Sequence, residues 1–189
     1  MAKILGFAGS LRRESFNKRL VRVAATGARD AGADVTVIDL ADYPLPIYDA
    51  DLEAEQGLPE NVMKLKELFH DHDALLIAAP EYNGSITGVL KNTIDWVSRP
   101  ADNEPPLFSF VGKVASLMAA SPGALGGMRG LVHVRAILSG IRVIVLPNQI
   151  AVPKAHEVFH GDTLTDERRR AAVEALGAEL AETARRLRG

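Results

Sequence analysis

The sequence predicts an α/β fold in which a five-stranded parallel sheet lies between two layers of helices. Short apolar runs alternate with amphipathic stretches from end to end, and several of the runs are rich in Val and Ile. No repeat, low-complexity tract or linker interrupts the 189 residues. Alternation of this kind is typical of parallel strands joined by right-handed helical crossovers. The length suits one domain, and we expect residues 1–189 to form it.

The five apolar runs are the expected strands, because strands that are buried on both faces are continuously apolar. These runs are Ile4–Ala8, Val35–Leu40, Ala74–Ala79, Val114–Ala120 and Val143–Leu146.

Apolar residues at helical spacing follow each run. In the first such stretch, from Phe16 to Ala31, Gly32 is suited to end the helix. The later stretches are Val62–Phe69, Ile86–Val97, Leu131–Leu138 and Ala171–Leu187, the last of which Thr165 would cap. The segments Tyr43–Pro59 and Pro100–Phe110 look irregular, and we expect both to be ordered surface loops.

The composition excludes several kinds of partner and site. Apolar residues make up 47% of the chain, charged residues 24%, and the net charge is −2, so we expect neither nucleic acid nor a membrane surface as a partner. The absence of cysteine excludes thiol chemistry, thiolate metal sites and disulfides. Gly6 and Gly9 interrupt the start too early for a signal peptide, and no apolar run is long enough to cross a bilayer. We therefore expect a cytoplasmic protein.

The candidate site is expected at the carboxyl ends of the strands, where open parallel sheets bind ligands near the reversal of strand order. The loops after the first, third and fourth strands have an unusual composition. In the strand order 2-1-3-4-5, which is common in such sheets, these three strands are neighbours, so their loops would meet.

The first loop, Gly9–Asn17, leads directly into a helix and is suited to a phosphate group. A helix N-terminus offers free backbone N–H groups and partial positive charge. Ser10, Ser15 and Asn17 add hydroxyl and amide donors, and Arg12 adds a charged donor. The loop lacks the glycine patterns of Walker A and Rossmann loops. The alternative interpretation is a polar turn in which Ser15 caps the helix.

The second and third loops could contact a flat heterocycle. In Pro80–Ser85, backbone amides, the Tyr82 ring and the Asn83 side chain could frame it, and Gly84 permits an unusual backbone angle. Ser121–Gly130 contains four glycines, which suit a backbone that passes close to a ligand. The alternatives are an ordinary turn before a helix cap for the second loop and a flexible connection for the third.

Taken together, these motifs resemble the NADPH-dependent FMN reductase family, which includes quinone reductases, chromate reductases and azoreductases. The resemblance covers nearly the whole chain in order. It is carried by Gly9-Ser10-Leu11-Arg12 with Ser15 and Asn17, by Pro80-Glu81-Tyr82-Asn83, and by Leu90-Lys91-Asn92 with Asp95-Trp96. It implies a flavodoxin-like fold, a three-layer sandwich with the sheet order 2-1-3-4-5, that binds flavin mononucleotide (FMN) non-covalently.

The resemblance also implies roles for the residues of the three loops. Ser10, Arg12, Ser15 and Asn17 would hold the FMN phosphate; Pro80, Glu81, Tyr82, Asn83 and Gly84 would border the isoalloxazine ring; Ser121 and Gly123 would close the other side. Gly126–Arg129, with His133 and Arg135, is similar to the family's pattern and is assigned to packing or subunit contact.

The reaction that the resemblance implies needs little from side chains. NADPH or NADH would deliver a hydride to the flavin, and a quinone or a similar small oxidant (chromate, an azo compound or free flavin) would then take the electrons. Glu81 is the nearest candidate acid, with a structural role in binding backbone N–H groups as the alternative. The resemblance further implies a homodimer or a homotetramer.

Two other functions are weighed against this one. A flavodoxin-like electron carrier that serves a protein partner would have a strongly acidic surface, and a net charge of −2 argues against that. A zinc hydrolase is suggested by the H-E-x-x-H motif from His156 to His160. Pro153 and Gly161 leave little room for the helix that this motif requires, so a solvated loop is favoured and no metal is expected.

Trp96 lies outside the apolar stripe of its predicted helix, which suggests an exposed contact surface. The family resemblance implies that subunits associate through this region. The alternative is that the Pro100–Phe110 loop covers the ring.

The choice between NADPH and NADH is left undecided, because no loop clearly offers a site for a 2′-phosphate.

Overall fold

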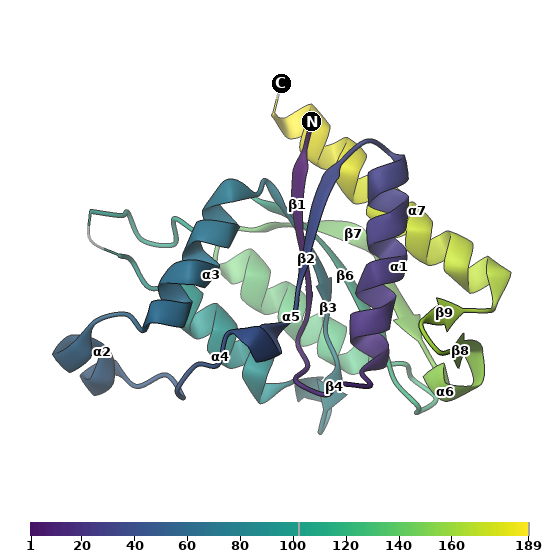
Figure 1. The fold of residues 1–189 in the computed structure, drawn as a ribbon, viewed down its shortest axis with the longest axis horizontal. Coiled ribbons are helices and arrows are strands. Elements are labelled where there is room, and N and C mark those ends of the chain that lie inside the picture. The colour runs from purple at the N-terminus through teal and green to yellow at the C-terminus, as the bar shows by residue number, and fades with distance from the viewer. Residues whose placement is uncertain (102, 189) are drawn as a thin grey trace.

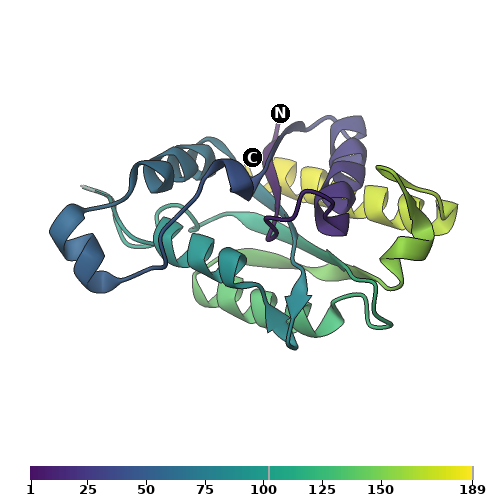
Figure 2. The same cartoon turned by 60° about the horizontal axis from the view of Figure 1, so that its bottom comes forward.

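The computed structural model describes residues 1–101 and 103–188. Asp102, within the predicted Pro100–Phe110 loop, and Gly189, at the end of the predicted domain, lie outside the described residues. A five-stranded parallel sheet in the order β2-β1-β3-β6-β7 forms the middle layer (Figures 1 and 2). Numbered along the chain, this order is 2-1-3-4-5, so the predicted sheet is confirmed. The sheet strands are β1 (Lys3–Ala8), β2 (Asp34–Ile38), β3 (Ala74–Ala78), β6 (Val114–Ala120) and β7 (Ile144–Val152).

Helices cover both faces of the sheet and give it two cores. One face packs against α1 and α7, and the other packs against α3, α4 and α5. The helices are α1 (Phe16–Asp30), the 3-10 helix η1 (Leu40–Asp42), α2 (Ala50–Gln56), α3 (Glu60–Asp71), α4 (Gly88–Val97), α5 (Met128–Gly140), α6 (Ala155–Val158) and α7 (Glu167–Leu187). Two short hairpins complete the fold: β4 (Glu81–Tyr82) with β5 (Ser85–Ile86), and β8 (Phe159–His160) with β9 (Thr163–Leu164). None of the helices in the described ranges combines the length and apolar character needed to span a bilayer.

The fifth strand is longer than predicted. The apolar pattern ends at Leu146, but β7 continues to Val152 after an irregularity in its pairing with β6. The Arg135 guanidinium of α5 supports this irregularity by donating to the carbonyl oxygens of Val145 at 3.3 Å and Leu146 at 2.8 Å. Arg135 therefore serves packing within the chain, one of the two roles predicted for it.

The prediction that Tyr43–Pro59 is irregular throughout was wrong, because the segment contains α2. All residues of α2 are at least partly exposed, so the helix lacks the apolar stripe by which a sequence pattern would reveal it. The cap of α7 was also misplaced by one residue. Asp166, rather than Thr165, is the N-cap, and its carboxylate accepts from the backbone N–H of Arg169 at 3.0 Å.

The prediction that Trp96 is exposed was wrong as well. Its side chain is fully buried, and its indole N–H donates to the carbonyl oxygen of Pro46 at 2.8 Å. The Tyr48 ring packs edge-on against the indole, with 5.0 Å between the ring centroids. Asn92 fastens the same segment to α4, accepting from the backbone N–H of Tyr48 at 2.8 Å and donating to Pro46 O at 2.8 Å. The segment before α2 therefore covers Trp96.

Candidate functional site

A small cavity of about 70 Å³ lies where the three predicted loops converge at the carboxyl ends of β1, β3 and β6. Residues from all three loops line it, which confirms that the loops meet. The predicted residues in the lining are Ser10, Arg12, Ser15, Asn17, Pro80, Glu81, Tyr82 and Ser121, to which the structure adds Phe16, Ala120 and Pro122. Asn83, Gly84 and Gly123 belong to the same loops but lie outside the lining.

One end of the cavity is formed by the loop between β1 and α1. Ser10 and Ser15 are buried, and Ser15 is the N-cap residue of α1. Within the described residues its hydroxyl does not cap the helix, which leaves this hydroxyl free of a cap bond at the N-terminus of α1, where Ser15, Phe16 and Asn17 line the cavity. Arg12 is exposed at the mouth, and its backbone N–H donates to the Ser10 hydroxyl oxygen at 3.4 Å.

Asn17 joins this loop to the end of β6. Its side-chain amide donates to the carbonyl oxygen of Ala120 at 2.8 Å, and its carbonyl oxygen accepts from the Ala120 backbone N–H at 2.9 Å. Both ends of the carboxamide are therefore used within the chain. The geometry gives Asn17 a positioning function, and this partner, 103 residues away, could not be seen in the sequence.

The second loop is a β-hairpin. Asn83 and Gly84 both have positive φ, 52° and 79°, and connect the two-residue strands β4 and β5. Asn-Gly is the preferred pair for a two-residue hairpin turn, because the turn that matches strand twist needs positive φ at both positions. The predicted unusual backbone angle at Gly84 is confirmed. The hairpin presents Tyr82 with 55% of its surface exposed beside the cavity.

Glu81 ties this hairpin to the third loop. Its carboxylate accepts from the backbone N–H groups of Arg129 at 3.0 Å and Gly130 at 3.3 Å, in the first turn of α5. The Arg129 guanidinium donates to the same carboxylate at 2.5 and 2.7 Å. Burial would raise the pKa of Glu81, but the hydrogen bonds from Arg129 and the Gly130 backbone outweigh burial, so the pKa is lowered. The carboxylate is ionised at neutral pH, which supports the structural role rather than that of an acid.

The glycine-rich third loop is shaped by close packing. Gly126 has φ of 62°, and a Cβ there would lie 2.7 Å from the Pro153 nitrogen. Gly127, the N-cap of α5, has φ of 93°, and its Cβ would lie 2.7 Å from that of Ala119. The Ser121 hydroxyl accepts from the Gly123 backbone N–H at 3.0 Å. The loop is therefore a defined turn rather than a flexible connection.

The sequence did not single out one support of the site, the contact of Gly9 with α4. The Thr87 hydroxyl donates to the Gly9 carbonyl at 2.7 Å, and a Cβ on Gly9 would lie 2.8 Å from the Leu90 Cβ. Thr87 also accepts from the Leu90 backbone N–H at 3.3 Å as the N-cap of α4. This contact fixes where the first loop leaves β1.

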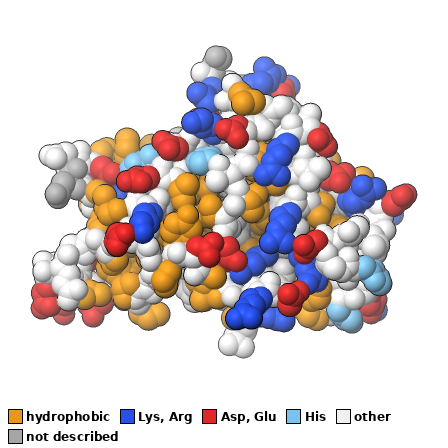
Figure 3. Space-filling model, viewed as in Figure 1, with side chains coloured by type: hydrophobic (Ala, Val, Ile, Leu, Met, Phe, Trp, Pro, Cys, Tyr) orange, Lys and Arg blue, Asp and Glu red, His pale blue; other side chains and the backbone are white. Residues whose placement is uncertain are grey.

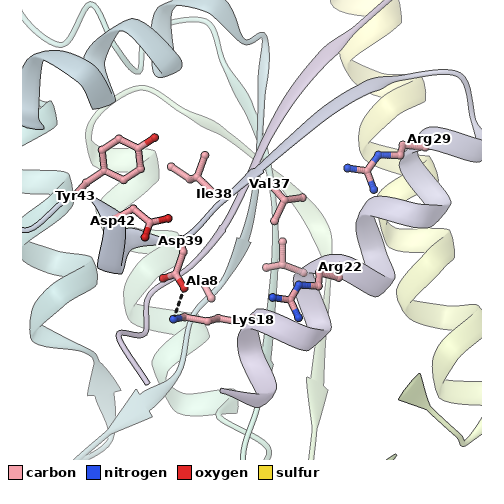
Figure 4. Close-up of a pocket in the computed structure, with 10 residues that line it drawn as sticks. Ala8, Lys18, Arg22, Arg29, Val37, Ile38, Asp39, Asp42 and Tyr43 are labelled. Atoms are coloured by element: carbon pink, nitrogen blue, oxygen red, sulfur yellow. Dashed lines mark hydrogen bonds and ion pairs between the residues drawn. The ribbon is translucent and has the colours of Figure 1, made fainter. Parts of the chain in front are cut away.

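A separate hollow of about 450 Å³ lies along the outer edge of the sheet, between α1 and β2 (Figure 4). Lys18 of α1 pairs there with Asp39 at 2.5 Å, and Arg22 pairs with Asp162 at 3.3 Å. Arg29 donates to the Val35 carbonyl oxygen at 2.8 Å, on the open edge of β2. The lining of this hollow contains none of the residues predicted for the site, and its three basic side chains have partners within the described chain.

The H-E-x-x-H motif does not form the helix that zinc binding requires. His156 and Glu157 lie in α6, which ends at Val158, and His160 lies in β8. In the described part of the chain, no group of three or more His, Cys, Asp or Glu side chains is arranged to hold a metal ion. The geometry therefore disfavours the zinc hydrolase hypothesis.

The visible surface also differs from that expected of an acidic electron carrier. On the face shown in Figure 3, acidic and basic side chains are interspersed over the helices. This face therefore does not present a docking surface of a single charge sign.

The donor set around the cavity fits FMN. Two buried serine hydroxyls, an exposed arginine and a helix N-terminus are the groups that bind a phosphate. The exposed hairpin beside them leaves space on the surface for a flat ring system. This fit rests on the chemistry and the arrangement of the residues.

Comparisons with known proteins agree with this arrangement. A family model described as NADPH-dependent FMN reductase matches residues 2–157. An NAD(P)H-dependent FMN reductase of Pseudomonas aeruginosa is 36% identical over 189 residues, covering 99% of this chain and 97% of the relative. A quinone reductase of Escherichia coli K12 is 39% identical over 145 residues, covering 76% of this chain and 73% of the relative. FerB, a flavoenzyme NAD(P)H:acceptor oxidoreductase from Paracoccus denitrificans, has a solved structure that matches with a TM-score of 0.81, at 28% identity over 98% of each chain.

These findings confirm the predicted fold, enzyme class and cofactors. The fold is flavodoxin-like, and an archaeal flavodoxin at 12% identity, aligned over 98% of this chain and 99% of its own, matches it with a TM-score of 0.64. The relatives are named for reductase activity, which does not favour the electron-carrier alternative. The chain is an oxidoreductase that uses FMN and NAD(P)H. It belongs to the NADPH-dependent FMN reductase family.

Proposed function

We propose that this reductase passes electrons from NADPH or NADH to quinones, at a site built by the three loops after β1, β3 and β6. The observation that carries the proposal is the cavity at the N-terminus of α1 that these loops line together. The quinone as oxidant is supported by the activity for which the E. coli relative is named. Chromate, azo compounds and free flavin are the similar oxidants to test beside it.

In this proposal the phosphate of FMN is bound by the first loop. Ser10 and Ser15 contribute hydroxyls, Arg12 contributes its guanidinium, and the N-terminus of α1 contributes backbone N–H groups. Asn17, whose carboxamide is bonded to Ala120, would act mainly by holding this loop at the end of β6.

The isoalloxazine ring would lie between the second and third loops. The hairpin residues Pro80, Glu81, Tyr82, Asn83 and Gly84 would border one side. Ser121 and Gly123 would close the other side. The support for this placement is that Glu81 fastens the hairpin to the start of α5, so the two walls are held at a fixed separation.

FMN, when bound, supplies the redox chemistry, accepting a hydride from NAD(P)H and returning electrons to the oxidant. The protein holds and orients it. Glu81 is ionised and fully engaged by Arg129 and two backbone N–H groups, so we assign it no proton transfer. The exposed Tyr82 leaves the ring side of the site accessible to donor and oxidant in turn.

We also propose that the enzyme works in the cytoplasm as a homodimer or a homotetramer with small-molecule substrates. The cytoplasmic location is supported by the need for NAD(P)H as the electron donor. The assembly is supported by the family resemblance. Trp96 does not support it, because its side chain is buried within the chain.

A visible absorption spectrum tests the proposed function. Protein that has been mixed with FMN and dialysed should keep a flavin spectrum. Anaerobic NADPH should bleach it, and a quinone should restore it. Retained flavin that NADPH bleaches but quinones do not reoxidise would overturn the choice of oxidant, while loss of the flavin on dialysis, with protein fluorescence unchanged in an FMN titration, would overturn the site.

A further inference from the structure

Two buried lysines of the described chain differ sharply in how their charges are satisfied. Lys66 is 2% exposed, and Lys113 is 7% exposed. The Lys66 ammonium donates to three acceptors: Glu104 at 2.7 Å, the Arg99 carbonyl at 2.7 Å and the Ser109 hydroxyl at 3.2 Å. An ammonium has three N–H donors, so this set satisfies Lys66 completely.

Lys113, by contrast, has a single acceptor among the described residues, the carbonyl oxygen of His72. No carboxylate of the described residues lies within 4 Å of its nitrogen. Burial lowers the pKa of Lys113, and the nearby Asp73 opposes this only in part. A buried charge without an ionic partner is destabilising, because nothing compensates for its removal from water.

Lys113 lines a cavity of about 230 Å³ at the opposite end of the sheet from the three loops. The cavity lies between the C-terminal end of α7 and the segments that lead into β3 and β6, so it borders the amino ends of these strands. Ligands of the FMN site at the carboxyl ends would therefore leave it accessible.

Among the described residues, the charged side chains that line this cavity leave one cation in excess. Asp73 accepts from Arg188 at 2.7 Å and from the Lys3 backbone N–H at 2.8 Å, so its charge is matched without Lys113. Burial, the largest influence, lowers the pKa of His70, so its ring is neutral at pH 7. Both ring nitrogens of His72 are engaged, with the Leu68 carbonyl and the Thr36 hydroxyl.

We propose that this cavity is a binding site for a small oxyanion, a carboxylate or a phosphate, whose oxygens accept hydrogen bonds from the Lys113 ammonium. Such a ligand supplies the negative charge and the acceptors that Glu104 and its neighbours supply to Lys66. The ligand is held by a charge-assisted hydrogen bond, the stronger kind in proteins. The site is independent of the FMN site and of its proposed substrates.

Calorimetric titration tests the proposal on protein loaded with one equivalent of FMN and freed of excess, in a chloride buffer. Inorganic phosphate and acetate are titrated separately into wild-type protein, Lys113→Met and the control Lys64→Met, an exposed lysine on α3. We expect one equivalent to bind to wild type and to Lys64→Met, and binding to weaken about tenfold or more in Lys113→Met, since one charge-assisted bond is lost.

A labelling measurement on wild-type protein gives an answer that does not depend on the variants. Reductive methylation, followed by peptide mass spectrometry, should be slowed at Lys113 but not at Lys64 by the anion that binds. Protection by phosphate alone identifies a phosphate site, protection by acetate alone a carboxylate site, and protection by both a general oxyanion site. Absence of both heat and protection, or equal binding by Lys113→Met, would overturn the proposal and leave water as the partner of Lys113.

Discussion

Arg12 is the charged donor among the side chains that line the small cavity, and it defines the first prediction at the scale of residues. Arg12→Ala should weaken FMN binding by about 1.5–3 kcal/mol, because a hydrogen bond to a charged group is lost. Fluorescence titration with FMN measures the change. Arg13→Ala, an exposed neighbour outside the lining, is the matched control and should bind FMN as wild type does. Equal affinities of wild type and Arg12→Ala would remove Arg12 from the phosphate site.

Glu81 gives a prediction about stability and pH. Glu81→Gln should lower the free energy of unfolding at pH 7 by about 1.5–3 kcal/mol, because the charge-assisted bonds to α5 are weakened. The folded-state pKa of Glu81 lies below its unfolded value of about 4.3. Its stabilisation is therefore present above the unfolded pKa and lost as the pH falls through the folded pKa.

Urea unfolding at pH 7 and at progressively lower pH checks this behaviour. The gap between wild type and Glu81→Gln should close in acid. Glu182→Gln, which removes an exposed carboxylate beside Arg185 and Arg186, should change little at any pH. A gap that is constant with pH would show that the ionised carboxylate is not what stabilises the loop.

At this scale the sequence predicts residue types better than partners. Ser10, Arg12 and Ser15 could be proposed as a phosphate site because a helix N-terminus follows them directly. The partner of Asn17 could not be predicted, since Ala120 lies 103 residues away and contributes only backbone atoms. Backbone groups have the same chemistry at every residue, so such pairs leave no mark in a single sequence.

At the scale of elements, the crossing of α1 and α7 depends on two glycines. A Cβ on Gly27 would lie 2.0 Å from the Glu174 carbonyl oxygen, and one on Gly177 would lie 1.9 Å from that of Ala24. Gly27→Ala should therefore force the helices apart and cost about 1–3 kcal/mol or more, although alanine favours a helix. Urea unfolding measures the loss.

Gly140→Ala is the control for this substitution. Gly140 is also a helical glycine, the last residue of α5. In the described structure, apart from its chain neighbours and the nearby backbone of its own helix, no heavy atom lies within 4 Å of a Cβ there. This variant should be as stable as wild type or slightly more stable. If Gly27→Ala were equally neutral, the close approach of α1 and α7 would not be a requirement of the fold.

Helices and strands could be predicted where one face is buried, because burial leaves an apolar pattern in the sequence. Elements without a buried face were missed. The helix that starts at Phe16 shows its apolar stripe clearly, and Gly32, with φ of 84°, follows its end as expected. By contrast, α2 has no buried residue, and β7 continues past a pairing irregularity that interrupts its apolar run. Trp96 was predicted to be exposed because it lies outside the apolar stripe of α4. A segment distant in sequence, around Pro46, covers that side of the helix.

At the scale of the whole molecule, the association state is the prediction to measure. The single chain has a mass of 20.3 kDa, and sedimentation should give two or four times that mass. FMN-loaded and FMN-free protein should be compared at several concentrations, because association follows mass action. A single-chain mass at all concentrations would overturn the proposed oligomer while leaving the FMN site as it is.

The fold class was predictable because it depends on the order of elements rather than on contacts. Alternating strands and helices allow few topologies, and right-handed crossovers reduce them further. The sheet order β2-β1-β3-β6-β7 then places the loops after β1, β3 and β6 side by side. The strand order does not determine which side chains line the cavity. Phe16 and Pro122 line it although no sequence motif marked them.

The double hydrogen bond between Asn17 and Ala120 has a consequence for how the enzyme acquires its cofactor. The bond closes only when a segment near the start of the chain meets the end of the fourth sheet strand. Contacts between such distant segments form late in folding, because a long stretch of chain must first lose its freedom. The loop between β1 and α1 would thus reach its final shape only after most of the sheet has assembled. A ribosome-bound nascent chain that has not yet exposed β6 should be unable to retain FMN, which would make flavin loading a step of maturation that follows folding.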